Sequence, residues 1–167
     1  PDGSGDPGRS ASDVGPGLGA MNVAPIGGDR TLKASTAETA SGTSTSLDGM
    51  GWVKSLHARL GVTAASGTTP TLDVYIQTQL ADGSWQDIAH FTQATGVTHE
   101  HVTWGPVQGN VAGTQAEGAA VTVDNFFADA DAALAATTIR LMNLGDSLRV
   151  KWVIGGTTPS FTFAVFS

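Results

Sequence analysis

The chain has 167 residues, a formal net charge of -7, only 8 Lys and Arg residues, and no Cys. The length fits one domain with a sizeable core. The absence of Cys excludes a disulfide framework and thiol chemistry, and the low basic content argues against a nucleic-acid partner. No window of the sequence approaches the roughly 18 apolar residues of a membrane span. From these two observations we expect neither a nucleic-acid partner nor a membrane partner.

Residues 1–30 have an unusual composition, with eight Gly and four Pro. The few apolar side chains in this segment follow no sustained period, so it cannot bury enough surface to offset the entropy of ordering it. We expect an extended arm that becomes ordered on a partner; the alternative is a passive linker or tail. The candidate partner contacts are Val23, Pro25, Ile26 and Leu32.

Residues 31–167 contain the alternating patterns of a β domain. The stretch 31–46 is rich in Thr, Ser and Ala and predicts an edge strand followed by a loop. From Trp52 to Ala65 the even positions are mostly apolar, which predicts a long strand with one buried face. The sequence SGTTP at 66–70 predicts a turn after this strand.

The remainder of the chain predicts further short strands separated by turn signals. An Asp-Gly hairpin signal at 81–84 joins two of them. Residues 105–120 read as a loop, and 128–136 alone have the composition of a short helix. The expected strands, in chain order, are 71–80, 85–91, 98–104, 120–127, 138–144, 147–155 and 160–167.

Many short strands with little helix predict an all-β fold, an antiparallel β-sandwich or jelly roll carrying an extended N-terminal arm. The apolar positions of the alternating strands predict one core shared by two sheets. The expected core residues are Trp52, Leu56, Leu60, Leu72, Val74, Ile76, Val150, Trp152, Phe161 and Phe163.

His99 and His101 are the best metal-ligand candidates in the sequence. An H-x-H pair on a strand puts both imidazoles on one face, where they could bind zinc or iron. His90 and Glu117 are the alternative third ligands of such a site. However, no carboxylate closely follows the pair, and a solvent-facing pair on a half-buried strand explains the same residues. We therefore expect no metal and no cofactor.

The sequence offers no convincing catalytic group. It contains no G-x-S-x-G elbow around a serine. Asp124, Asp129 and Asp131 are close in sequence, but they lie beside the possible short helix, where acids commonly serve as caps. We expect a non-enzymatic protein without catalytic residues.

The four tryptophans allow an alternative function. Exposed aromatic residues on a β-face bind sugars in many carbohydrate-binding modules. Trp52, Trp104 and Trp152 fall on the apolar face of their strands and are expected in the core, whereas Trp85, next to the hairpin turn, could be exposed. A sugar-binding module therefore stays as an alternative that depends on the D-G-x-W sequence ending at Trp85.

Two segments, TLDVYIQTQLADGSWQDIAHFTQATG (71–96) and TIRLMNLGDSLRVKWVIGGTTPSFTFAVFS (138–167), carry a resemblance. Their pattern of strand, D-G-x-W, strand, and then R-h-K-W-x-h-G-G-T-x-P-x-F-T-F resembles small structural proteins of tailed-bacteriophage virions. The resemblance covers about a third of the chain. It implies a β-sandwich that decorates or connects the capsid, made in the bacterial host cytoplasm and located on the virion surface.

The expected function is therefore that of a capsid decoration (cement) protein whose partner is the major capsid protein or another virion protein. A role at the portal, in the head–tail region or in a head fibre is the alternative within this class. The segment 29–46 offers a weak edge strand, and an uncovered edge invites pairing with another chain. The resemblance implies a homotrimer, in which we expect Val23, Ile26 and Leu32 to be buried at subunit or capsid contacts.

Overall fold

The computed structural model describes residues 29–104, 122–124, 133–140, 142 and 144–167. Within these residues the fold is all-β, as predicted, and contains no helix. The strands are β1 (Thr31–Glu38), β2 (Gly42–Thr43), β3 (Leu47–Asp48), β4 (Leu56–Gln79), β5 (Trp85–His90), β6 (Thr98–Trp104), β7 (Thr122–Asp124), β8 (Thr138–Arg140) and β9 (Ser147–Phe166).

The two longest strands, β4 and β9, organise the molecule. They pair antiparallel from Arg59↔Phe166 at one end to Thr78↔Leu148 at the other. The main strand order is β1-β9-β4-β5-β8-β7, with β2 and β3 also on β9 and with β6 on β4. All these pairs are antiparallel except β7–β8, which is parallel.

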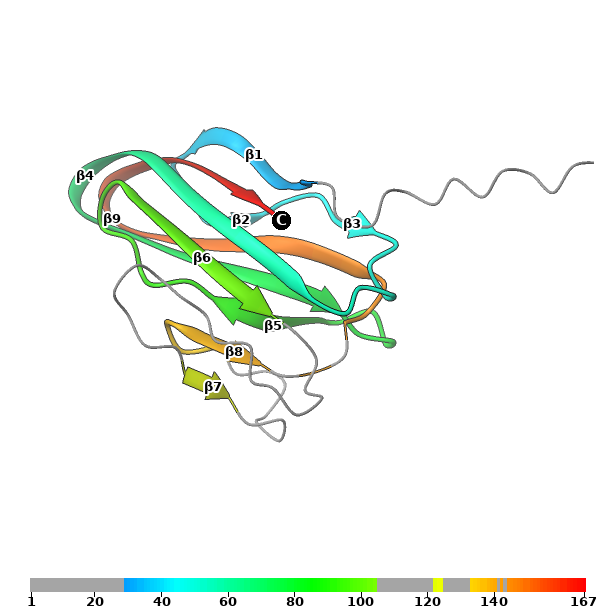
Figure 1. The fold of residues 1–167 in the computed structure, drawn as a ribbon. Helices are drawn as coiled ribbons and strands as arrows, with labels where there is room; N and C mark the ends of the chain where they lie inside the picture. Colours follow the sequence, from blue (N-terminus) through cyan, green and yellow to red (C-terminus); the bar gives the residue numbers. More distant parts are fainter. Residues whose placement is uncertain (1–28, 105–121, 125–132, 141, 143) are drawn as a thin grey trace, which may run out of the picture.

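β4 and β9 turn together at one end of the molecule, and this turn folds the sheet over itself (Figure 1). The first half of β4 pairs with β6 and with the second half of β9, which also carries β1. The second half of β4 pairs with β5 and with the first half of β9. The two halves of the sheet therefore form the two layers of the predicted sandwich.

The corner between the layers lies where GTTP at 67–70 crosses GTTP at 156–159. Gly67 and Gly156 have φ of 113° and 110°, and Thr69 and Thr158 have φ of 47° and 48°. The sequence analysis predicted a turn between separate strands at each motif. Instead each strand continues through its motif, because the two kinks pair with one another and the hydrogen-bonded ladder resumes after local register shifts.

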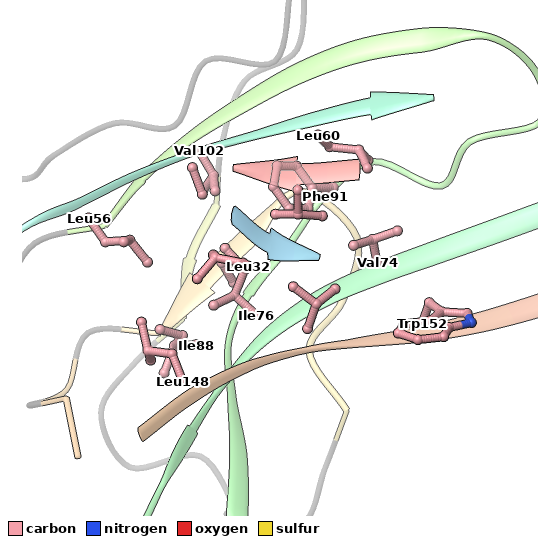
Figure 2. Close-up of a cluster of buried hydrophobic side chains, with 14 of the residues drawn as sticks. Leu32, Leu56, Leu60, Val74, Ile76, Ile88, Phe91, Val102, Leu148 and Trp152 are labelled. Carbon is pink, nitrogen blue, oxygen red and sulfur yellow. The ribbon is translucent and has the colours of Figure 1, made fainter. Parts of the chain in front are cut away.

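The core lies between the two layers (Figure 2). Leu56 and Leu60 come from one layer and pack in the same cluster as Val74 and Ile76 from the other. Nine of the ten predicted core residues are buried, which confirms the alternation on β4 and β9. Trp52 is the exception: its prediction was wrong, because it lies in a turn before β4 begins and is 52% exposed.

β1 is an edge strand, as predicted, and among the described strands it pairs with β9 alone. Leu32 points from β1 into the chain's own core and is 4% exposed. Residues 133–136 of the predicted short helix are not helical, and residues 128–132 lie outside the described part of the chain. The predicted loop at 105–120 also lies outside it, while 122–124 within the predicted strand 120–127 form β7.

Candidate functional site

A cluster of polar side chains lies on the face of β4, β5 and β9 that is opposite the core. Asp87 on β5 is 5% exposed. Its carboxylate accepts hydrogen bonds from Gln77 Nε2 at 2.7 Å and Lys151 Nζ at 3.3 Å. Gln77 Oε1 in turn accepts a 2.7 Å bond from Arg149 Nε. A buried carboxylate is costly unless it is paired and hydrogen-bonded. Gln77 and Lys151 compensate it directly, and Arg149 holds Gln77 in place.

Aromatic rings on this face are covered by cations of the same chain. The Tyr75 ring stacks on His90 with centroids 3.9 Å apart, and Lys151 Nζ lies 4.3 Å from the Tyr75 ring centre. The Arg149 guanidinium lies 4.2 Å from the ring centre of Trp85, which is half-buried. These cation–π contacts occupy the ring faces that a sugar would need.

The electrostatics of this face follow from burial and from its carboxylates. Burial raises the pKa of Tyr75 above 10.0, and the negative charges of Asp73 and Asp87 raise it further. Burial lowers the pKa of Arg149, and the nearby Asp87 opposes that shift. The raised pKa keeps the Tyr75 hydroxyl protonated near neutral pH, so this hydroxyl is neither a nucleophile nor a base there.

His90 has both ring nitrogens engaged. Its Nδ1 lies 2.8 Å from the carbonyl oxygen of Leu134, and its Nε2 lies 3.2 Å from Asp73 Oδ1. A carbonyl oxygen and a carboxylate are both acceptors, so the two bonds form together only when both nitrogens carry a proton. His90 therefore fastens residue 134 to the sheet and has no nitrogen left for a metal or for base catalysis.

The sequence-predicted metal candidates lie on the other layer. His101 is on β6 beside β4, and its ring stacks on His57 with centroids 5.7 Å apart. His99 is exposed, and its ring lies against Gly61. The described residues contain no group of three or more His, Cys, Asp or Glu side chains that could hold a metal ion. His90 does not join the pair, and Glu117 lies outside the described part of the chain.

The remaining candidates are widely separated or undescribed. Asp124 ends β7 at one edge of the sheet, and Asp129 and Asp131 lie outside the described residues. The proposed arm contacts at 23–26 also lie outside them. Leu32 contributes to the chain's own core. A partner that reaches β1 would therefore contact the exposed residues of this strand and not Leu32.

Sequence reasoning missed the network around Asp87. The signal was present as polar residues at alternate positions of neighbouring strands, namely Gln77, Arg149 and Lys151. Their meeting depends on the cross-strand register Gln77↔Asp87 and Gln77↔Arg149, and a bulge between Ile76 and Gln77 sets the register with β5. Because every member is hydrogen-bonded within the chain, the network stabilises the fold.

Comparison with protein-family models, with curated proteins and with solved structures finds no match for this chain. Among the described residues, no helix is both long and apolar enough to cross a bilayer. The surfaces that the fold leaves open, above all the edge at β1, are therefore the features of this chain that bear on its function.

Proposed function

We propose that this chain is a non-enzymatic structural protein of a bacteriophage virion, a decoration (cement) protein that bridges capsid subunits. Its mechanism is mechanical: the sandwich and its N-terminal arm bury area across joints that internal pressure would otherwise open. The partner is the major capsid protein or another virion protein, and the chain acts as a homotrimer.

The observation that carries this proposal is the open edge of the sandwich. β1 pairs with β9 on one side, and no strand among the described residues pairs with its other side. Four consecutive exposed residues follow Lys33 on this strand, and all have small or short polar side chains: Ala34, Ser35, Thr36 and Ala37. A strand with a free edge offers backbone donors and acceptors to an added strand.

The arm joins the sandwich beside this edge. Arg30 makes two backbone hydrogen bonds with Ser167, with its N–H donating at 2.6 Å and its carbonyl accepting at 2.8 Å. These bonds fasten the start of β1 to the end of β9. An arm fastened beside an open strand is well placed to engage a neighbour, which fits a protein whose work is to connect subunits.

A homotrimer sets a geometric condition on this contact. A ring of three copies needs heterologous interfaces, in which one surface meets a different surface of the next copy. Two β1 edges paired with each other would give a twofold dimer instead. We therefore propose that the arm of one copy adds to the β1 edge of the next, through Val23, Pro25 and Ile26.

The resemblance noted in the sequence also fits the sheet. The segments 71–96 and 138–167 are separate in sequence, yet they supply β5, β8, the second half of β4 and the first half of β9, which are neighbours in one layer. The sugar-binding alternative receives less support. Trp85 and Tyr75 are covered by Arg149 and Lys151, and the exposed Trp52 lies in a turn before β4.

Light scattering at micromolar concentration tests the proposed assembly. We expect the full chain to be a trimer and Ser35→Lys to weaken it, because a lysine at an open edge opposes strand addition. Thr63→Lys is the matched control, since Thr63 is exposed on the central strand β4. A full chain that stays monomeric both free and on the particle contradicts the trimer, as does a trimer that Ser35→Lys leaves intact.

A further inference from the structure

The outer face of the other layer, formed by β6, β4 and β9, gathers basic and aromatic side chains. One row of cross-strand neighbours runs His101 on β6, Arg59 on β4, Phe166 on β9 and Thr31 on β1. His57 lies two residues before Arg59 on the same face of β4, and His99 lies two residues before His101. We call His57, Arg59, His99, His101 and Phe166 the basic face.

The side chains of the basic face are available to a partner. His57, Arg59 and His99 are exposed, His101 is half-buried, and Phe166 is 41% exposed. In the part of the chain that the structure describes, Arg59 takes part in no ion pair and no side-chain hydrogen bond. His57 Nδ1 lies 3.0 Å from Thr103 Oγ1 on β6, and the Nδ1 of His101 is buried.

The unpaired positive charge of Arg59 contrasts with the other described cations of the chain. The formal net charge is -7, with only 8 Lys and Arg in total. Lys33 and Lys151 are engaged by Glu38 and Asp87, and Arg149 by Gln77 and the Trp85 ring. The basic face keeps its charge unpaired and includes no acidic side chain, since the buried Glu100 points to the opposite side of β6.

We propose that the basic face binds an acidic segment of a partner protein, with Arg59 pairing a carboxylate and Phe166 contacting an apolar side chain. Charge complementarity selects the acidic partner. The exposed phenylalanine beside Arg59 favours a peptide over a simple anion, because an aromatic ring flanked by a cation suits a mixed acidic and apolar segment. This proposal does not depend on the virion function, since any acidic partner would be bound in the same way.

Fluorescence anisotropy tests the proposal with the full chain and a short labelled peptide of glutamates around one central phenylalanine. We expect the peptide to bind. Arg59→Gln should weaken binding about three- to tenfold, because the substitution removes the positive charge that pairs with a carboxylate.

The controls separate the proposed site from general charge attraction. Lys54→Gln removes one exposed positive charge from the loop before β4 and should leave the affinity unchanged. The glutamine version of the peptide should not bind. The proposal is wrong if Arg59→Gln and Lys54→Gln have equal effects, if the peptide does not bind, or if a single-stranded oligonucleotide binds more tightly than the peptide. Thermal melting confirms that these surface variants are folded.

Discussion

Replacing Gly156 with Ala should strongly destabilise the protein, because the corner of the sandwich leaves no room for a β-carbon. An ideal Cβ at this position would lie 2.7 Å from Thr69 O, 3.0 Å from Pro70 Cα and 3.0 Å from Thr68 O. All three atoms are backbone, so no side-chain rotation relieves the clash. Gly156 also has a φ of 110°, which L side chains rarely adopt.

The magnitude follows from these two terms. A left-handed backbone costs a residue with a β-carbon about 1–2 kcal/mol, and forcing an extra carbon into a packed site costs about 1–3 kcal/mol. We therefore expect Gly156→Ala to lower the free energy of unfolding by about 2–5 kcal/mol. Gly67→Ala should cost about the same, since its Cβ would lie 2.7 Å from Thr158 O and 2.9 Å from Pro159 Cα.

Alanine substitutions at two other glycines separate the cost of the unusual backbone conformation from the cost of the steric clash. Gly83 has a φ of 85° but nothing within 4 Å of an added Cβ, so Gly83→Ala should show the backbone cost alone. Gly96 has neither feature and should tolerate Ala with little change. Urea unfolding of the four variants measures the series. If Gly156→Ala lowers the free energy of unfolding no more than Gly83→Ala does, the two GTTP motifs do not cross as closely as described.

The remaining predictions concern the core and the buried charges. Trp152→Ala should cost about 3–5 kcal/mol as a large-to-small core change, whereas Trp52→Ala should change the free energy of unfolding by less than about 0.5 kcal/mol; urea titrations compare them. Asp87→Ala should cost about 3–5 kcal/mol, because it leaves a partly buried Lys151 without its carboxylate; a loss below about 1 kcal/mol would contradict the network. Burial raises the pKa of Glu100 above its ordinary 4.5, with hydrogen bonds from Thr92 opposing. The folded state then holds this proton more tightly than the unfolded state, so stability should fall as pH rises from about 4.5 through the raised pKa. Glu100→Gln should reduce that fall in urea midpoints measured between about pH 4 and pH 7, and an unchanged slope would contradict it.

Local patterns in the sequence predicted the strands and nearly all of the core. Leu56, Leu60, Val74 and Ile76 alternate with polar residues, and this period is enough to assign their face. Trp52 fitted the same period, but the strand begins only at Leu56, and alternation alone cannot locate a strand's start.

The corner and the polar network could not be predicted in the same way. Each GTTP motif has the residues of a turn, and only their mutual pairing keeps β4 and β9 continuous. The bonds of Asp87 likewise depend on the register of three strands. Such features belong to pairs of distant segments, so one stretch of sequence does not contain them. The basic face is of this kind too, since Arg59 and Phe166 become neighbours only through the pairing of β4 with β9.

The most direct test of the central claim is the copy number of this chain in purified particles of a phage that encodes it. Quantitative mass spectrometry against the major capsid protein gives that ratio. A decoration protein predicts hundreds of copies per particle, in a fixed ratio to the capsid subunit. A handful to a dozen copies would place the chain at a vertex or the neck, and its absence from purified particles would contradict a structural role in the virion.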